Sequence, residues 1–359
     1  MWNSLWESRS LPFPAAWKPD AILSPKEWEI CRKEMQDLIC QWEYGIFPDK
    51  PDSIKAEILE ENTNFCAGKA LLQKIKLTAA FCGQSFSFPF TFVLPKREQP
   101  VPAVVFVNFR PNVPDEYLPS EEISDRGVAV ASFWYHDVTS DDGDFSNGLA
   151  GCYYQGRPRA ATDPGKIAFW AWAAVLVLDY LLTRSEILPD QIAVAGHSRL
   201  GKTALFAGAM ESRFCAAYSN NSGCGGAALN RGKVGETIDR ICGRFPYWFC
   251  ENFQQFSGHE DQLPFDQHTL LALLAPRKLY VASAQEDQWA DPLSEYLGCA
   301  AASCAWEALG LTGFASAERP PVPGDVFHKG DIGYHLRPGA HYLSRYDWNQ
   351  FFDFMGWNL

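Results

Sequence analysis

From Val101 onward, the sequence contains short, continuous apolar runs that alternate with longer stretches of helical character. The runs are PAVVFVNF, GVAVASFWY, QIAVAG, CAAYSNNSG and RKLYVASAQ, with a weaker one at DIGYHLRPG. The helical stretches cover residues 165–184, 199–210, 266–274, 292–309 and 342–355. Continuous apolar strands that alternate with helices are typical of a parallel sheet buried on both faces. The pattern therefore predicts a three-layer α/β/α sandwich with a mostly parallel central sheet.

The part of the chain before this alternation, residues 1–95, follows a different pattern. Ser24, Pro25 and Glu27 have the order of an N-cap, a first-turn proline and a capping-box carboxylate, which predicts the start of a helix. Polar and apolar residues alternate in the segments 53–62, 69–81 and 85–95. Alternation of this kind predicts antiparallel strands. We expect residues 1–359 to form a single domain.

Two long segments interrupt the core that we expect at 96–359. The first, near 136–164, is rich in Gly and Asp, and the second, near 223–265, mixes Gly, aromatic and charged residues. Loops of this length inside a compact domain are usually lids or walls of a binding site. Aromatic residues make up 14% of the chain, including 13 Trp, which fits either a large aromatic core or a flat-faced ligand such as a sugar.

The segment 190–210, DQIAVAGHSRLGKTALFAGAM, has two possible interpretations. GHSRLGKT matches the P-loop of nucleotide hydrolases. Together with its flanks, however, the same segment is a strand, a sharp turn at Ser198 and a helix, which is the setting of a nucleophile elbow. A P-loop also needs a strand that ends in a magnesium-binding Asp, and the only VLVLD run, 175–179, lies inside a predicted helix. We therefore expect a serine hydrolase, with a nucleotide hydrolase as the alternative.

Ser198 is the predicted nucleophile. The following helix N-terminus favours negative charge that develops at this position, and Gly196 and Gly201 would let strand and helix approach closely. The second glycine follows the serine by three residues, so the pattern G-x-S-x-x-G departs from the common G-x-S-x-G.

His341 is the predicted general base, because it lies in a loop after the last strand and before the terminal helix. Three other histidines are weaker candidates. His335 lies within a predicted strand, His268 lies on a predicted helix, and the side chain of His197 should point away from the serine oxygen.

The predicted acid is Asp287, which lies in the turn after the penultimate strand, where a carboxylate can orient the histidine ring. Glu286 and Asp291 in the same turn are alternatives. We expect oxyanion donors from the backbone N–H of Arg199 and from the loop after VVFVNF, around Phe109 and Arg110. The Arg199 guanidinium could add a charged donor.

Composition limits the partners and the location. A formal net charge of −12 argues against a nucleic-acid partner. Eleven scattered cysteines without C-x-x-C pairs suggest neither a disulfide framework nor a zinc site, and we expect no metal or organic cofactor. The N-terminus shows no basic and apolar export pattern, and the apolar stretch 167–182 is too short for a comfortable membrane span. We therefore expect a cytoplasmic protein with no membrane partner, and the oligomeric state stays open.

The chain resembles a known family. GHSRLGK is similar to the G-C-S-R-x-G-K elbow of the glucuronoyl esterases, family fifteen of the carbohydrate esterases, and of related bacterial acetylxylan-esterase-like α/β-hydrolases. The resemblance continues through NNSGCGGAAL and GYHLRPGAH. It implies that Ser198 attacks a glucuronate ester, that Arg199 supports the oxyanion, that Lys202 contacts the sugar acid and that Trp289 lines the sugar pocket.

One position departs from the family pattern. Many members carry a triad glutamate in a motif like E-S-G-x-G-G, where this chain has Asn221. Other members use the acid after the penultimate strand, which points to Asp287. The resemblance leaves a glucuronoyl ester and an acetylated sugar open as substrates. The alternative is a catalytically silent carbohydrate-binding protein that has kept the fold.

Overall fold

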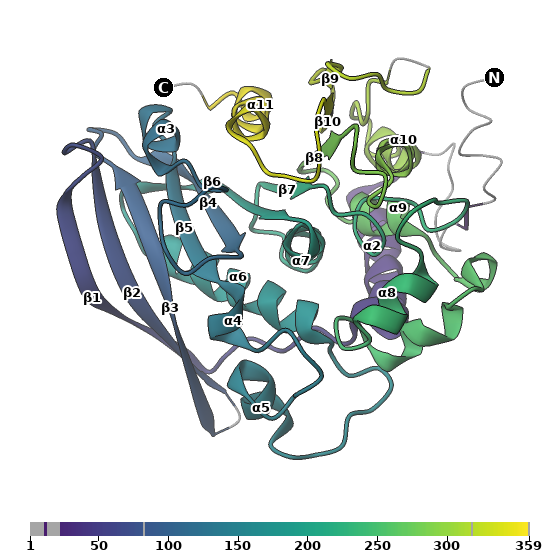
Figure 1. Ribbon diagram of the computed structural model, residues 1–359, viewed down its shortest axis with the longest axis horizontal. Coiled ribbons are helices and arrows are strands. Elements are labelled where there is room, and N and C mark those ends of the chain that lie inside the picture. The colour runs from purple at the N-terminus through teal and green to yellow at the C-terminus, as the bar shows by residue number, and fades with distance from the viewer. Residues whose placement is uncertain (1–10, 13–21, 82, 317–318, 358–359) are drawn as a thin grey trace.

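The computed structural model describes residues 11–12, 22–81, 83–316 and 319–357. Within these residues, ten strands form one sheet in the order β1-β2-β3-β5-β4-β6-β7-β8-β10-β9 (Figure 1). The strands are β1 (Ser53–Phe65), β2 (Ala70–Phe81), β3 (Gln84–Pro95), β4 (Val101–Asn108), β5 (Ala129–Trp134), β6 (Ile187–His197), β7 (Ala216–Asn220), β8 (Lys278–Ala284), β9 (Val326–Phe327) and β10 (Ile332–Arg337). The segment 1–20, for which we expect no export signal, lies outside the described residues except for residues 11–12.

The central part of this sheet is parallel. Strands β5, β4, β6, β7, β8 and β10 pair in parallel in that order. The predicted antiparallel strands before the core also form, and β3 pairs antiparallel with β5, so they extend the same sheet. The very short β9, which the sequence pattern does not predict, pairs antiparallel with β10. The predicted α/β-hydrolase architecture is confirmed.

The principal helices form where the sequence predicts them, with small changes at their ends. They are α2 (Pro25–Ile39), α6 (Lys166–Leu181), α7 (Arg199–Met210), α9 (Gln267–Ala272), α10 (Pro292–Glu307) and α11 (Arg345–Met355). Helix α2 starts with the predicted capping box of Ser24 and Glu27. Helix α11 begins at Arg345 instead of at 342, because Ser344 and Asp347 form a capping box there.

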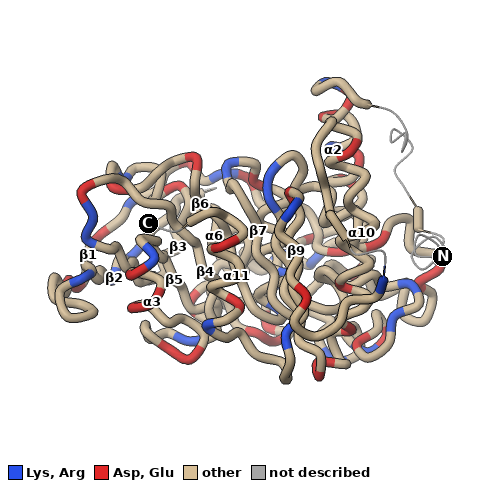
Figure 2. Tube along the Cα trace, turned by 90° about the horizontal axis from the view of Figure 1, so that it is seen from above, with Lys and Arg blue, Asp and Glu red and all other residues tan. Residues whose placement is uncertain are grey.

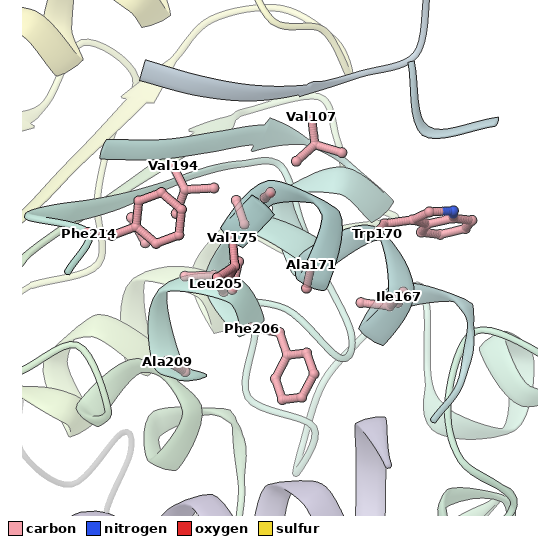
Figure 3. Close-up of a cluster of buried hydrophobic side chains, with 14 of the residues drawn as sticks. Val107, Ile167, Trp170, Ala171, Val175, Val194, Leu205, Phe206, Ala209 and Phe214 are labelled. Carbon is pink, nitrogen blue, oxygen red and sulfur yellow. The ribbon is translucent and has the colours of Figure 1, made fainter. Parts of the chain in front are cut away.

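Helices cover both faces of the sheet. In Figure 1, α11 and α3 (Ser120–Asp125) lie on one side and α6 and α7 on the other. Figure 3 shows Val107 and Val194 of the sheet facing side chains of these last two helices, including Val175 and Leu205. Every residue of α6 except Asp179 is buried, so the longest apolar stretch of the sequence is a core helix. None of the described helices has the length and apolar character needed to cross a bilayer.

The two long segments that interrupt the predicted core, expected as long loops, contain short helices. They are α4 (Tyr135–Val138) and α5 (Gly148–Tyr154) in the first, and α8 (Ile238–Arg244), η2 (Glu251–Phe256) and η3 (Glu260–Gln262) in the second. The segments meet, because Trp248 Nε1 donates to Asp141 Oδ1 at 2.6 Å. The buried Lys166 ammonium holds the first segment by donating to Thr139 Oγ1 and to the carbonyl of Asp144.

Charged residues of both signs are distributed over the chain. Figure 2 shows Lys and Arg interspersed with Asp and Glu along the trace that this view exposes. The excess of acidic residues, 43 against 31 basic ones, is therefore spread over the molecule in this view.

Candidate active site

A cavity of about 330 Å³ lies where strands β6, β7 and β8 end and the long segments meet. In a parallel sheet, the carboxyl ends of the strands are the usual place for a ligand. The cavity is lined by Ser198, Arg199, Lys202, Asn221, Ser222, Gly223, Glu236, Arg244, Phe245, Trp248, Asp287, Trp289, Ala290 and His341.

Ser198 occupies a sharp turn between β6 and α7. Its backbone has φ 57° and ψ −127°, a conformation that L-residues rarely adopt. A Cβ on Gly196 would collide with the carbonyl of Leu200, and a Cβ on Gly201 would lie 3.1 Å from Ser219 Oγ. Both positions therefore favour glycine. Gly201, the second glycine of the pattern, faces Ser219 of β7.

His341 and Asp287 are hydrogen bonded at the cavity wall. Nδ1 of His341 lies 2.6 Å from Oδ2 of Asp287. The carboxylate is almost completely buried, whereas 41% of the imidazole is exposed. Burial alone would raise the pKa of Asp287, but the hydrogen bond and charge of His341, together with the Ala290 N–H, outweigh it and hold that pKa below its ordinary value. The carboxylate is thus ionised and can orient the imidazole and stabilise its protonated form.

The two alternative acids, Glu286 and Asp291, do not bond to His341. Glu286 is exposed, and its backbone N–H donates to the carbonyl of Gly339. Asp291 is buried and caps α10, where its carboxylate accepts hydrogen bonds from Ser294 and from the Val234 N–H. Neither residue lines the cavity. Among the three carboxylates, only Asp287 contacts His341.

The other histidines do not line the cavity. His335 in β10 and His268 in α9 are buried. His197 is also buried, with Nδ1 2.6 Å from Asn220 Oδ1 and its ring 4.5 Å from the ring of His341. Burial, with a further contribution from His341, lowers the pKa of His197 to about 3. His197 is therefore a neutral ring that packs against His341.

The Arg199 guanidinium is fixed beside Ser198 by an ion pair and by aromatic rings. Nη1 donates to Asp141 Oδ2, and the guanidinium carbon lies 4.6 Å from the ring centre of Trp248. Its Nε is buried and has no hydrogen-bond partner among the described residues. Because Arg199 lines the same cavity as Ser198, its guanidinium is a fixed positive charge in the site.

The predicted second oxyanion donor is not placed at the cavity. Neither Phe109 nor Arg110 lines it. The Arg110 N–H donates to Asn108 Oδ1 at 3.2 Å, and its guanidinium pairs with Glu116. The ring of Phe109 lies against the guanidinium of Arg199, 5.6 Å away. Phe109 thus contacts Arg199 without lining the cavity. The backbone N–H of Arg110 is already hydrogen bonded to the side chain of Asn108.

Glu236 connects two predicted substrate-binding residues, and sequence analysis did not find it. Its carboxylate accepts from Lys202 Nζ at 3.0 Å and from Trp289 Nε1 at 3.2 Å. Lys202 is buried and also donates to the Ser222 carbonyl, whereas 42% of Trp289 is exposed. Glu236 lies in the segment 223–265, where no periodic pattern singles out one acidic residue from its neighbours.

No group of three or more His, Cys, Asp or Glu side chains with the arrangement of a metal site occurs among the described residues. The chemical groups at the cavity are thus a hydroxyl, an imidazole held by a carboxylate, a charged guanidinium and a lysine with its carboxylate partner.

Comparisons with known proteins match the chain to carbohydrate esterases. The family model described as "Glucuronyl esterase, fungi" matches residues 77–310. A carbohydrate esterase of an unknown prokaryotic organism is 44% identical over 64% of this chain and 53% of its own length. A 4-O-methyl-glucuronoyl methylesterase of Podospora anserina is 31% identical over 80% of this chain and 58% of its own length. The chain thus spans little more than half the length of these curated relatives.

Two solved structures cover almost the whole chain. A promiscuous esterase of carbohydrate esterase family 15 from a marine bacterial metagenome has a TM-score of 0.84 at 31% identity and covers 99% of both chains. A glucuronoyl esterase of Solibacter usitatus has a TM-score of 0.87 at 28% identity and covers 98% of this chain and 99% of its own. The elbow, the shared architecture and these matches together show that the chain belongs to the glucuronoyl esterase family, carbohydrate esterase family 15.

Proposed function

We propose that this protein is a serine esterase that hydrolyses uronic acid esters of the glucuronoyl type. The observation that carries the proposal is the convergence of Ser198, the hydrogen-bonded pair His341–Asp287 and the Arg199 guanidinium on one cavity. A hydroxyl that lines the same cavity as an oriented imidazole and a fixed cation gives the groups that acyl transfer requires. The convergence thus favours the esterase over a silent binding protein.

The reaction follows from the positions of these groups. Ser198 Oγ attacks the ester carbonyl carbon while His341 takes the hydroxyl proton, and the negative oxygen formed accepts hydrogen bonds from Arg199. Collapse of this intermediate breaks the bond to the alcohol, which leaves with the proton from His341. A water molecule, deprotonated by His341, then attacks the acyl-enzyme, and the acid is released when Ser198 recovers its proton. Asp287 holds the imidazole and stabilises its charged form.

The walls of the cavity favour a sugar acid as the acyl group. The pair Lys202–Glu236 and the indole of Trp289 give hydrogen-bonding groups and an apolar face within a space of about 330 Å³. A pyranose ring can stack on an indole and bond to such charged groups through its hydroxyls. An acetyl group would leave these groups unused. The names of the curated relatives support a glucuronoyl ester.

The test compares two ester classes with the same purified protein. We expect kcat/KM for a benzyl glucuronate ester to exceed that for acetylated xylo-oligosaccharides by roughly tenfold or more, because each buried polar contact to a sugar hydroxyl contributes about 1 kcal/mol. Equal or reversed preference would contradict the proposed substrate class. Absence of hydrolysis of any ester would favour the silent carbohydrate-binding protein.

The variant Glu236→Gln tests the binding of the sugar acid. It should raise KM for the glucuronate ester and leave p-nitrophenyl acetate hydrolysis unchanged.

We also propose that the protein works in the cytoplasm. The ten cysteines that the structure describes are all free, and five of them are buried. Thiols that stay unpaired fit a reducing compartment. The substrate there would be an ester on a short, imported oligosaccharide.

A further inference from the structure

The side chain of Arg337, at the end of β10, binds the loop that carries His341. Its Nη1 donates to the carbonyl of Pro338 at 3.0 Å, and its Nη2 donates to the carbonyls of Ala340 and Tyr342 at 3.0 and 2.5 Å. The last two carbonyls belong to the residues on either side of His341. One guanidinium therefore fixes the backbone on both sides of the imidazole.

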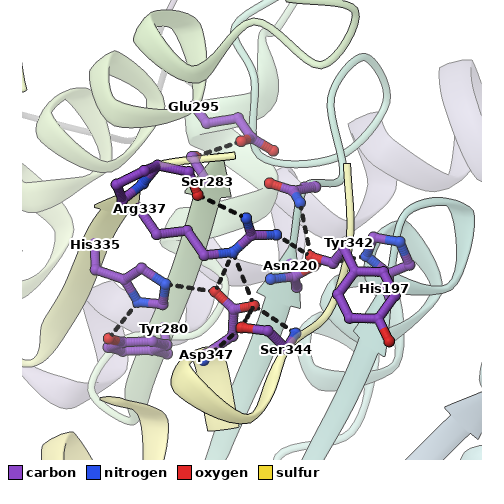
Figure 4. A network of polar contacts seen from close by, with 12 residues as sticks. His197, Asn220, Tyr280, Ser283, Glu295, His335, Arg337, Tyr342, Ser344 and Asp347 are labelled. Carbon is purple, nitrogen blue, oxygen red and sulfur yellow. Dashed lines mark hydrogen bonds and ion pairs between the residues drawn. The ribbon is translucent and has the colours of Figure 1, made fainter. Parts of the chain in front are cut away.

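A buried carboxylate holds this guanidinium in place. Both oxygens of Asp347, in the first turn of α11, lie 3.0 Å from Arg337 Nε, and Figure 4 shows the pair at the centre of a polar network. Asp347 also accepts from His335 Nε2 at 2.8 Å and from the Ser344 N–H at 2.6 Å. Because Asp347 is fully buried and held by several donors, its ion pair fixes the Arg337 guanidinium in place.

The backbone next to Arg337 also holds the turn that carries Asp287. The carbonyl of Arg337 accepts from the Gln285 N–H at 2.9 Å, and the carbonyl of Gly339 accepts from the Glu286 N–H at 3.0 Å. The segment 337–339 thus joins the turn with the acid to the loop with the histidine. Any shift of this segment would move His341 relative to Asp287.

We propose that Arg337 is a positioning residue of the active site, which sets the place of the His341 imidazole through the two flanking carbonyls. The inference rests on the proposed function, because it concerns the same imidazole. A guanidinium is required since its planar set of donors reaches three carbonyls and a carboxylate at once, whereas a lysine ammonium is a single point charge on a flexible stem. The charge alone would not hold the loop.

The experiment is Arg337→Lys with Arg277→Lys as its matched control. Arg277 likewise binds backbone carbonyls, those of Glu211, Phe214 and Leu273. It lies next to the start of β8, however, whereas the cavity lies where the parallel strands end. For Arg337→Lys we expect kcat on a benzyl glucuronate ester to fall by roughly 10- to 100-fold with KM nearly unchanged, because a shift of about 1 Å in a catalytic group has this effect. The control should lose a similar amount of thermal stability and keep its kcat.

The outcomes separate this inference from the proposed function. A wild-type protein that hydrolyses no ester would overturn the proposed function and the inference with it. An active wild type with normal kcat in Arg337→Lys would overturn the inference alone, and so would an equal loss of kcat in Arg277→Lys, because the role of Arg337 would then be only structural.

A second pair of variants serves if Arg337→Lys does not fold. Gly339 has φ +96°, and a Cβ there would lie 3.2 Å from Arg337 Nη1, whereas Gly324 has the same φ with nothing within 4 Å of its Cβ. Gly339→Ala should lower kcat at least tenfold, and Gly324→Ala should cost comparable backbone strain without loss of kcat. Equal kcat in the two variants would contradict the proposed role.

Discussion

Ser198 is held in a strained backbone conformation that places its hydroxyl at the cavity. A positive φ in a residue with a side chain costs on the order of 1–3 kcal/mol. The surrounding structure offsets this cost, because the Ser198 N–H donates to the carbonyl of Asn220 at 2.8 Å and α7 starts directly after it. The strained backbone conformation of Ser198 thus directs its hydroxyl away from the sheet and into the cavity.

The carboxylate of Asp287 should be essential for turnover. Asp287→Asn keeps the shape but removes the charge that stabilises imidazolium, so we expect kcat to fall by roughly 10³-fold or more. Because the folded-state pKa of Asp287 is below its ordinary value, its stabilising contribution is complete above the ordinary pKa and is lost as pH falls through the lowered one. Steady-state kinetics of Asp287→Asn on the glucuronate ester measure the fall in kcat.

The control for this substitution is Glu286→Gln, in the same turn. Glu286 is exposed and lies outside the cavity, so its kcat should stay within about twofold of wild type, as for most surface substitutions. Near-normal turnover in Asp287→Asn together with a loss in Glu286→Gln would move the role to Glu286.

At this scale, the sequence predicts residues that follow strands and misses residues in the long segments. Ser198, Asp287 and His341 each come directly after an apolar run, so their meeting at one sheet edge can be expected. Glu236 and Asp141 lie in segments without periodicity, and their contacts depend on how two irregular segments fold together. The local pattern at the end of β4 also does not predict that the Asn108 side chain accepts a hydrogen bond from the predicted oxyanion donor, the Arg110 N–H.

Among the elements, the π-helical turn η1 (Cys40–Tyr44) after α2 has a distinct role. Its Glu43 is fully buried and accepts from Gln267 Nε2 at 3.0 Å, while the Tyr44 hydroxyl donates to the carbonyl of Gly225. Burial raises the pKa of Glu43 to about 8. The turn therefore attaches α2 to α9 through the Glu43 carboxyl group, which is protonated at neutral pH, and to Gly225 through the Tyr44 hydroxyl.

This carboxyl group should make folding stability depend on pH. The folded-state pKa of Glu43 is raised, so its contribution is complete below the unfolded-state pKa of about 4.3 and is lost as pH rises through about 8. Glu43→Gln removes this titration. We expect the free energy of unfolding of the variant, relative to wild type, to increase by about 1 kcal/mol or more between pH 5 and pH 9. Urea unfolding at the two pH values measures it, and a difference that does not change with pH would contradict the expectation.

The sequence predicts long elements better than short ones. Helices α6, α7 and α10 follow long apolar or capped stretches, and their predicted bounds lie close to the observed ones. Helices α4, α5 and α8 are too short to show a helical period, so tertiary contacts decide whether they form. The two-residue strand β9 exists only through its pairing with β10.

On the scale of the whole molecule, the order of strands in the sheet is the feature that the sequence leaves open. The alternation of runs and helices predicts a parallel sheet, but it does not tell that β3 pairs with β5 instead of with β4, its neighbour in sequence. Such pairings join residues far apart in the chain, and local patterns carry no information about them.

The free cysteines give a prediction for the whole molecule. Because the ten described cysteines are unpaired, a reducing agent should leave the midpoint of thermal unfolding unchanged within about 1 °C, since no cross-link constrains the unfolded chain. Thermal scans with and without dithiothreitol test this. A drop of several degrees in the reducing agent would reveal a stabilising disulfide and would argue against the proposed cytoplasmic location.

The central claim is that Ser198 is the group that attacks the ester. Its most direct test is mass spectrometry of the protein after reaction with a fluorophosphonate, which forms a stable adduct with an activated serine. We predict one adduct, on the peptide that contains Ser198, and none in a folded Ser198→Ala variant that also no longer hydrolyses the glucuronate ester. An adduct on another residue, or ester hydrolysis that persists in Ser198→Ala, would contradict the account.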